Sequence, residues 1–388
     1  MGRKRGLASL STHPGTGKEN PCPQRVWERP RALPGDTWFW SRAAAAGTLM
    51  HFGARPRRPA CARMAAVPLT RIGLSAMSAL ICGSLAFDTI MVFPDQFKNH
   101  ILPDKVHILN VSFLVPRMRR EFGGCAGNIA YNLHLLGGAP IPMGTVGSDF
   151  GPYREHFDAL GIDLSRVRVI EELFTPQAFI TTDHDNNQIT AFHPGAMMRS
   201  YENHVKDVPG VTLGLVGPDG REGMIQNAIE FKEMGVPFIF DPGQAMPLFN
   251  GPELRTFIEQ ADYVVVNDYE SNLLQERTGW NEKEIVGRVK AYITTRGPKG
   301  AVIHTPDKSY DIPPAHERRV VDPTGCGDAF RAGLIFGIQK GYDWLTIGRM
   351  GNLMGALKVE HPGTQNQRFT FDEFNEQFKQ QFGYALSA

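Results

Sequence analysis

Short apolar segments alternate with longer segments of helical periodicity from residue 79 onward. Strands that alternate with helices form largely parallel sheets with helices on both faces. The sequence therefore predicts an α/β fold with a doubly covered, mostly parallel central sheet. The apolar segments lie at 79–84, 141–145, 212–216, 236–240, 263–266, 291–295 and 301–304, and the helical ones at 127–136, 152–160, 221–234, 251–260 and 269–277.

Two segments interrupt this alternation. Residues 85–120 and 175–193 are rich in β-forming side chains, and the run 183–187 in the second segment favours a turn. We interpret both segments as a small β-strand lid on the main domain. A lid of this kind excludes water from a closed site.

The first 76 residues differ in charge from the rest of the 388-residue chain, whose formal net charge is +1. Lys and Arg far outnumber Asp and Glu there, and no hydrophobic period would bury a face. We expect this segment to be disordered, or to be upstream sequence that a start assigned too early has included, with Met77 or Met64 as the actual start. The folded domain is then 77–388.

Composition excludes several classes of protein. No apolar stretch reaches the roughly 18 residues needed to span a bilayer, and the basic leader comes with no recognisable nucleic-acid-binding module. The five cysteines include no Cys-x-x-Cys pair, so neither a disulfide framework nor a zinc site is indicated. We expect a cytoplasmic protein with no membrane or nucleic-acid partner.

The segment 320–339 runs from an extended stretch through Gly325 and Gly327 into an apolar helix. Free N–H groups at a helix N-terminus, with the positive end of the helix dipole, form an anion site that glycine lets a phosphate approach closely. Asp328 falls in the first helical turn, where a carboxylate could deprotonate an attacking hydroxyl. The alternative is that Asp328 merely caps the helix. The pattern favours phosphoryl transfer from a nucleoside triphosphate to a small-molecule hydroxyl.

Four further segments place polar or glycine residues after expected strands or at a helix start: 83–88, 122–131, 267–270 and 294–300. In α/β sheets, ligands bind beyond the carboxyl ends of the strands. Asn267 and Glu270 lie three residues apart, so one helical turn could present both to a phosphate and a hydrated Mg²⁺. Ordinary packing or solvated loops would also explain each segment taken alone.

Two motifs carry a family resemblance, Gly123-Gly-Cys-Ala-Gly-Asn128 and Asp322-Pro-Thr-Gly-Cys-Gly-Asp328. Together with 112–115, 192–197 and 267–270, they make residues 79–385 similar to the ribokinase-like (PfkB) carbohydrate and nucleoside kinases. Within that family the chain looks most like the bacterial adenosine kinases. The resemblance implies that Asp328 is the general base and that the N–H groups of Gly325, Cys326 and Gly327 form the anion hole.

The resemblance also implies a substrate site. Carboxylate and amide acceptors would hold the vicinal diol of a ribose, and aromatic rings in the lid would stack on a purine. Ala178 stands where some relatives have an aromatic residue, which leaves the base pocket wider or differently filled. The implied substrate residues are Ser84, Asp88, Ser112, Phe113, Gly124, Asn128 and Phe192.

On the nucleotide side, the resemblance implies that Asn267, Thr295, Gly297 and Asn352 contact ATP and that Glu270 organises Mg²⁺ through water. Asp322, Thr324 and 360–365 match a monovalent-cation site in some members, which leaves K⁺ open as a further cofactor. The reaction we expect is ATP-dependent phosphorylation of the 5′-hydroxyl of adenosine. Inosine, guanosine or a free sugar such as ribose remain alternative acceptors, a non-catalytic nucleotide-binding regulator is an alternative of another class, and pairing of lid strands in a homodimer stays open.

Overall fold

The computed structural model describes residues 77–101, 111–185 and 187–387. Our expectations for residues 1–76 lie outside this part of the chain, as does the stretch 102–110 of the expected lid. Within the described ranges, no helix is long and apolar enough to cross a membrane.

A nine-stranded sheet forms the centre of the domain, in the order β13-β12-β11-β10-β9-β8-β1-β4-β5. The strands from β11 to β5 pair in parallel, whereas β12 and β13 are antiparallel additions at one edge. The strands are β1 (Ser78–Cys82), β4 (Ala139–Gly147), β5 (Val167–Ile170), β8 (Val211–Val216), β9 (Phe238–Phe240), β10 (Tyr263–Asn267), β11 (Ala291–Thr295), β12 (Ala301–His304) and β13 (Ser309–Ile312).

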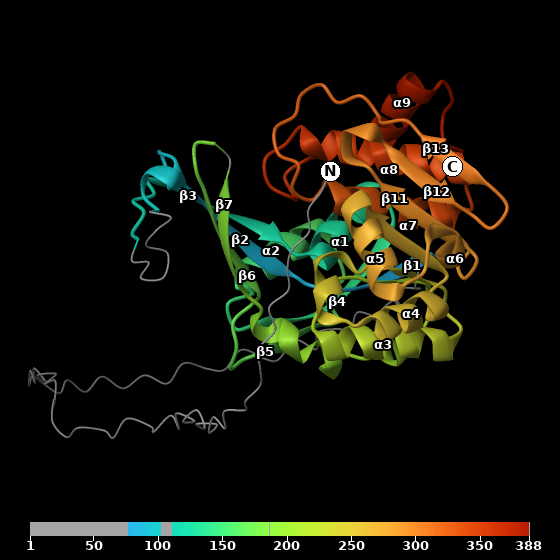
Figure 1. Cartoon of the computed structure of the whole chain (residues 1–388), viewed down its shortest axis with the longest axis horizontal. Coiled ribbons are helices and arrows are strands. Elements are labelled where there is room, and N and C mark those ends of the chain that lie inside the picture. The colour runs from blue at the N-terminus through green and yellow to red at the C-terminus, as the bar shows by residue number, and fades with distance from the viewer. Residues whose placement is uncertain (1–76, 102–110, 186, 388) are drawn as a thin grey trace, which may run out of the picture. The chain divides into compact units, whose positions relative to one another are not determined.

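Helices cover both faces of this sheet (Figure 1). The helices are α1 (Cys125–Leu135), α2 (Gly151–Leu160), α3 (Arg221–Met234), α4 (Gly251–Gln260), α5 (Asp268–Thr278), α6 (Glu282–Val286), α7 (Cys326–Lys340), α8 (Trp344–Val359) and α9 (Phe371–Phe382), with short 3₁₀ helices at Phe97–Asn99, Gly195–Glu202, Val205–Asp207, Gly243–Leu248 and Gly297–Lys299.

Alternation along the strands divides the core into two apolar clusters. In β1, Ala79 and Ile81 pack into the cluster formed with α1, α2, α7, α8 and α9, whereas Leu80 and Cys82 pack into the cluster formed with α3, α4, α5 and α6. Successive side chains of a strand point to opposite faces, and a strand covered on both faces therefore reads as a continuous apolar run.

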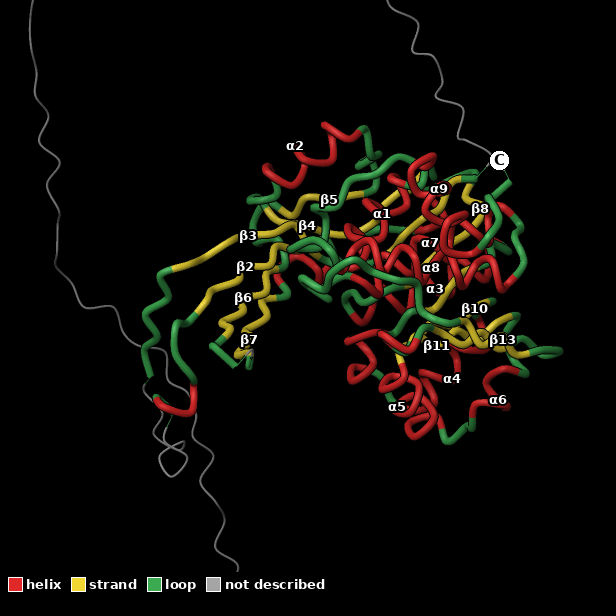
Figure 2. Tube along the Cα trace, turned by 90° about the horizontal axis from the view of Figure 1, so that it is seen from above, coloured by secondary structure: helices red, strands yellow, loops and turns green. Residues whose placement is uncertain are grey.

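A second sheet forms the lid, in the order β3-β2-β6-β7. Its strands are β2 (Ala86–Val92), β3 (Arg117–Gly123), β6 (Gln177–Thr182) and β7 (Gln188–His193). Figures 1 and 2 both show this sheet to one side of the helix-covered core. The chain enters it after Ser84, leaves it at Gly124, and returns to it after Thr175.

The predicted fold class is confirmed: the domain is α/β, with a mostly parallel, doubly covered sheet and a small β-strand lid. The sequence patterns did not predict β5, β13, α6, α8 or α9. The strands β5 and β13 have only four residues each and lie at the edges of the sheet, so each offers too few positions for a period to be recognised.

Candidate active site

The carboxyl ends of the parallel strands place the candidate residues along one edge of the sheet. Asn267 at the end of β10 stands beside Thr295 at the end of β11 in the strand register. Asp241 follows β9 directly, and its N–H donates to the carbonyl of Val216 at the end of β8. Residues from segments far apart in the sequence therefore meet at this edge, as parallel α/β sheets require.

The helix α7 begins at this edge with a free N-terminal turn. Gly325 precedes it with φ 78°, a left-handed conformation that glycine adopts without strain. A Cβ at this position would also lie 3.1 Å from the side chain of Thr364. The N–H of Cys326 donates to the carbonyl of Pro323, so that donor of the predicted anion hole is partly used by the loop itself. The other first-turn N–H groups have no intrahelical acceptor and can bind an anion.

The thiol of Cys326 does not behave as a helix N-terminus alone would suggest. Its pKa is raised to about 11 because burial disfavours the thiolate, although the ammonium of Lys358 opposes this. Cys326 is therefore a neutral, half-buried side chain that fills space in the loop.

Asp328 lies in the first turn of α7 with one carboxylate oxygen bound. Its Oδ2 accepts a hydrogen bond of 2.8 Å from Nδ2 of Asn128 in α1. Burial raises the pKa of Asp328 to about 6, while Arg331 and the Asn128 hydrogen bond hold it down and the carboxylates of Asp241 and Asp88 push it up. A carboxyl group with this pKa is ionised near neutral pH and basic enough to accept a proton from a hydroxyl.

A buried ion pair lies directly beneath Asp328. Nη2 of Arg331 donates to Oδ1 of Asp241 at 2.7 Å, and Nε of Arg331 donates to Oδ2. The two side chains are only 7% and 3% exposed, and Nη1 of Arg331 also binds the carbonyl of Gly327 at 3.1 Å. The pair thus joins the first turn of α7 to the end of β9. Neither partner was predicted, although Asp241 follows a buried strand and Arg331 interrupts an apolar helix.

Asn128 belongs to a closed network of amides and a phenol. Its Oδ1 accepts from Nε2 of Gln365 at 3.0 Å, and that same nitrogen lies 2.7 Å from the hydroxyl of Tyr153. The Tyr153 hydroxyl donates to the carbonyl of Gly123 at 2.9 Å. The Asn128 side chain therefore orients Asp328 here, and its predicted contact with ribose hydroxyls stays a prediction. Tyr153 belongs to no local motif, and Gln365 was marked only as part of the segment 360–365 that resembles a monovalent-cation site, so this network was not predicted.

Asp88 lies on β2 in a cross-strand row that continues across the lid. It pairs with Glu121 of β3 on one side and Ala178 of β6 on the other, and Ala178 pairs in turn with Phe192 of β7. Paired side chains on neighbouring strands share a face, so Asp88, Ala178 and Phe192 line one strip of the lid. Burial, with the charges of Glu121 and Asp322, raises the pKa of Asp88 to about 6.

The loop between lid and core accepts only glycine at two positions. A Cβ on Gly123 would run into the Asp88 carboxylate, and a Cβ on Gly124 would lie 2.5 Å from the carbonyl oxygen of Ser84. Gly124 also has φ 85°. The hydroxyl of Ser84 accepts from the N–H of Cys125 at 3.2 Å, so it binds the start of α1. Ser84 and Gly124 thus fix the geometry beside Asp88, while direct substrate contacts from them remain predictions.

The predicted aromatic residues of the lid do not form one cluster. The ring of Phe113 packs against Phe93, Phe97 and His100, with centroid distances of 4.8, 5.1 and 6.4 Å. Phe192 is 52% exposed and makes no ring contact with another described side chain. Ser112 is exposed on the segment before Phe113. Phe192 therefore presents a free aromatic face on the Asp88 row, whereas Phe113 stabilises the lid itself.

The nucleotide-side residues occupy the next strand ends. Asn267 and Glu270 form a capping box on α5, in which each side chain accepts from the backbone N–H of the other. This pattern was readable in the sequence as Asn-x-x-Glu before a helix. Burial and Asp241 raise the pKa of Glu270. Nδ2 of Asn352 donates to the carbonyl of Pro313 at 2.8 Å, and Gly297 is exposed with φ 55°.

The residues around Glu270 fit a Mg²⁺ ion held through water. One Glu270 oxygen is used by the capping box, which leaves the other available, and no group of three or more acidic, His or Cys ligands exists in the described ranges. Mg²⁺ in phosphoryl-transfer sites typically keeps several waters and needs one or two carboxylates plus phosphate oxygens. The site therefore matches a substrate-borne Mg²⁺ better than a protein-caged one.

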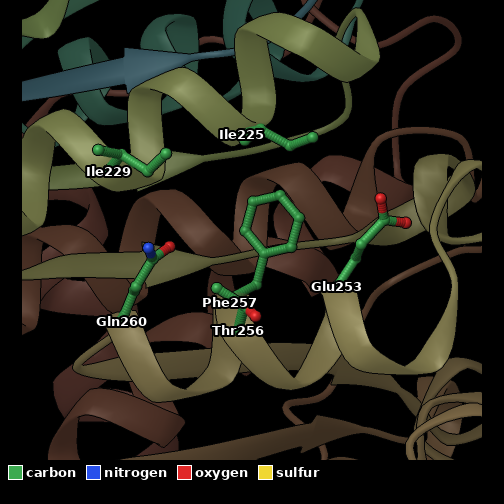
Figure 3. A pocket seen from close by; sticks show the side chains of 6 residues that line it. All are labelled: Ile225, Ile229, Glu253, Thr256, Phe257 and Gln260. Carbon is green, nitrogen blue, oxygen red and sulfur yellow. The ribbon is translucent and has the colours of Figure 1, made fainter.

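A separate surface pocket of about 200 Å³ lies between α3 and α4. Figure 3 shows the six side chains that line it, among them Ile225, Phe257 and Glu253. None of them is a candidate active-site residue. This pocket is also smaller than the roughly 300–1,000 Å³ usual for small-molecule sites, so we assign the chemistry to the strand ends.

Comparison with known proteins agrees with this geometry. The model of the pfkB family of carbohydrate kinases matches residues 89–370. The nucleoside kinase of Burkholderia thailandensis, solved in complex with inosine, is 54% identical with a TM-score of 0.74, and the match covers 80% of this chain and 100% of that one.

An archaeal relative is similar to this chain over most of its length. The nucleoside kinase of Methanocaldococcus jannaschii is 33% identical over 275 residues, which is 70% of this chain and 89% of that protein. Its crystal structure, described as an archaeal member of the ribokinase family, has a TM-score of 0.71 and covers 78% of this chain and 98% of that one. The chain therefore belongs to the pfkB family of carbohydrate kinases and has the ribokinase-like fold that its sequence motifs predicted.

Proposed function

We propose that this protein transfers the γ-phosphoryl group of ATP to the 5′-hydroxyl of a purine nucleoside, with adenosine as the acceptor. The observation that carries the proposal is Asp328, a carboxylate of raised pKa in the free first turn of α7, held by Asn128 beside a lid strip that contains Asp88 and Phe192. The similarity to nucleoside kinases supports a nucleoside rather than a free sugar.

The proposed step needs one base and one anion site. Asp328 accepts the proton of the 5′-hydroxyl, the hydroxyl oxygen forms a bond to the γ-phosphorus, and the bond from that phosphorus to the bridging oxygen of ADP breaks. The charge that spreads over the γ-phosphoryl oxygens faces the N-terminus of α7, where the helix dipole and free N–H groups stabilise it. Mg²⁺, organised through Glu270, would neutralise charge on the β- and γ-phosphates.

Asp88 is the side chain we assign to the ribose diol. It is half-buried at the junction of lid and core, and its carboxylate lies against Gly123. At neutral pH its ionised oxygens can accept from two neighbouring hydroxyls, which orients the third for attack. The Asn128 amide is assigned to the same sugar through Asp328, because one of its two N–H groups donates to Asp328 and its oxygen accepts from Gln365.

Inosine is the second acceptor that an observation favours. The related Burkholderia thailandensis enzyme was solved with inosine bound. Opposite Phe192 in the strand register, this chain has the methyl group of Ala178, which cannot hydrogen-bond a substituent on a purine. A surface without hydrogen-bonding groups discriminates weakly between substituents, so we propose that adenosine and inosine are both phosphorylated.

An acceptor screen tests this function. Purified protein is supplied with Mg²⁺, radiolabelled ATP and, in turn, adenosine, inosine, guanosine, ribose or fructose, with the Asp328→Ala variant as the matched control. We expect labelled nucleoside 5′-monophosphate from the wild type and a loss of roughly 10²–10⁴ in turnover from the variant. Preferential labelling of ribose would overturn the purine assignment, and ATP binding without any acceptor turnover would favour a non-catalytic regulator.

We also propose that the lid mediates a homodimer. Met118, Phe179 and Ile189 on the lid strands are exposed by 70%, 40% and 43%, and β3 and β7 are the two free edges of its sheet. Exposed apolar side chains and unpaired strand edges favour association with another chain. A second copy of this chain would cover them.

A further inference from the structure

Lys358 is a buried lysine near the end of α8, close behind the anion loop. The residue is 0% exposed. Its Nζ donates to the carbonyl oxygen of Asp322 at 2.8 Å and to that of His361 at 3.1 Å. In the part of the chain that the structure describes, no carboxylate oxygen comes close enough to Nζ to form an ion pair. The ammonium is thus coordinated by backbone carbonyls.

Such an arrangement is unusual for a buried charge. Burying an ammonium costs free energy unless it is paired or fully hydrogen-bonded, and burial does lower the pKa of Lys358. The charge of Asp322 opposes that shift. Carbonyl oxygens that converge on a cation of this size are the ligands that a potassium or ammonium ion also takes from a protein.

The two carbonyls belong to a segment that supports the phosphate-binding turn. The side chain of Asp322 accepts from the N–H of Thr324 at 3.0 Å and from that of Gly363 at 2.9 Å. The carbonyl of Val359 accepts from the N–H of Asp322 at 3.1 Å. Three residues beyond Asp322 the chain reaches Gly325 and the start of α7. The position of Asp322 therefore sets the position of the anion hole.

We propose that the Lys358 ammonium is a built-in cation that positions the 322–325 loop, so that phosphoryl transfer by this chain requires no added monovalent cation. The residues do not fit the K⁺ site that the family resemblance left open, because Lys358 already binds the carbonyls of Asp322 and His361. Lys358 acts through the loop and not on the substrate, so it is a positioning residue. This inference rests on the phosphoryl transfer proposed above.

The test combines cation dependence with chemical rescue. Wild type, Lys358→Met and the control Lys340→Met, which removes an exposed lysine from the end of α7, are assayed with ATP and adenosine. The base buffer contains tetramethylammonium chloride, and KCl or NH₄Cl replaces it at constant ionic strength. Thermal melts of each variant establish that it is folded.

We expect wild type and Lys340→Met to turn over equally well with and without K⁺. Lys358→Met should lose about 10²-fold in kcat through misplacement of the loop, with little change in the KM for adenosine, and K⁺ or NH₄⁺ should restore at least a tenth of the loss. If Lys358→Met does not fold, Lys358→Ala with added ethylammonium provides the same rescue test.

Two results would overturn the inference. One is strong activation of the wild type by K⁺, and the other is a folded, inactive Lys358→Met that no small cation rescues. If the wild type phosphorylates no acceptor in any buffer, the proposed function has failed instead, and the two failures are thereby distinguished.

Discussion

At the scale of single residues, the proposed base lies in a local sequence motif, whereas most of the groups around it come from distant segments of the chain. Asp328 was predictable because two glycines and a helix start surround it within ten residues of sequence. Apart from Arg331, three residues along α7, the groups that shift its pKa are Asn128, Asp241 and Asp88, between 87 and 240 residues away along the chain. No local pattern encodes those distances, so Asp328 could be proposed as the base from sequence while its pKa could not be predicted.

Replacing Asp328 with Asn should separate activity from stability. The pKa of Asp328 is raised from its ordinary value of 3.8 to about 6 in the folded protein. Its protonation therefore contributes stability that is fully present below pH 3.8 and is lost as the pH rises through about 6. Asp328→Asn keeps an acceptor for Asn128 and has no charge to bury. We expect turnover to fall by roughly 10²–10⁴ and the melting temperature at pH 8 to rise by about 2–4 °C. The gain should vanish near pH 4, and a lower melting temperature at pH 8 would contradict the burial argument.

The pH profile of the wild type should have an acid limb near pH 6. Asp328 and Asp88 must both be ionised to accept hydrogen bonds from hydroxyls, and burial raises the pKa of each to about 6. Because the charge of Asp88 raises the pKa of Asp328, the two groups are coupled and the limb reports the pair rather than one residue. We expect kcat/KM for adenosine to be constant above pH 7 and to fall below pH 6 by about tenfold or more per unit. The residual activity of Asp328→Asn should fall less steeply as the pH decreases. A slope identical to that of the wild type would show that Asp328 does not contribute to the acid limb.

The Arg331–Asp241 pair offers a test in which stability and activity respond differently. Arg331→Met leaves the Asp241 carboxylate buried without a partner, which should lower the free energy of unfolding by about 3–5 kcal/mol. Adding Asp241→Leu removes that charge and should restore most of the loss, as measured by urea denaturation. Arg331 lowers the pKa of Asp328 more than Asp241 raises it, so the double variant should show its acid limb at a higher pH than the wild type, but at a lower pH than Arg331→Met alone. A double variant no more stable than the single one would show that the unpaired charge is not the cause.

At the scale of elements, periodicity and turn chemistry predicted the bounds of individual helices and strands. The bounds of α3 and α4 agree with their hydrophobic patterns to the residue, and β10 and β11 agree within one residue. The register that aligns Asp88, Ala178 and Phe192 across three strands was not predictable, because pairing between strands depends on contacts across the fold. The expectation that Ala178 leaves the base pocket wider or differently filled came from the resemblance alone. The register places Ala178 between Asp88, which we propose to bind the ribose diol, and the free aromatic face of Phe192.

Enlarging Ala178 should weaken nucleoside binding without affecting the base. In Ala178→Phe, a ring would fill the strip between Asp88 and Phe192 and compete with the purine for the face of Phe192. We expect the KM for adenosine and inosine to rise at least tenfold with kcat much less affected, since the lost interaction is made equally in ground and transition states. The control is Ala191→Phe, on the neighbouring row and the opposite face of the same sheet. Light scattering must show that this control keeps the mass of the wild type, because Ala191 pairs with Phe179 on the proposed dimer face. Equal effects from the two variants would indicate a general disturbance of the lid.

At the scale of the whole molecule, lid and core are joined by bonds that cross between them. Arg119 of β3 binds Asp322 at 3.3 Å, and Asn366 binds Glu121 at 2.9 Å, so the lid contacts the loop that Lys358 holds. Positioning of the anion hole and placement of the lid are therefore mechanically linked through Asp322. We therefore expect that pairing of two lids in a dimer would affect the position of the anion hole through Asp322.

The proposed dimer gives the prediction that belongs to this scale. Met118 and Ile189 lie in one row across all four strands of the lid, with Met91 and Thr181 between them. Replacing Met118 and Ile189 with Glu therefore places charges on a single face of the sheet. We expect the wild type to have twice the chain mass by light scattering and the Met118→Glu, Ile189→Glu variant to have the mass of one chain. Met234→Glu, which alters a 39% exposed methionine on α3, should stay dimeric. If the dimer supports the lid, the monomeric variant should show a higher KM for adenosine. Its melting temperature should be nearly unchanged, because the altered side chains are exposed in the single chain. A wild type that is already monomeric would refute the lid interface.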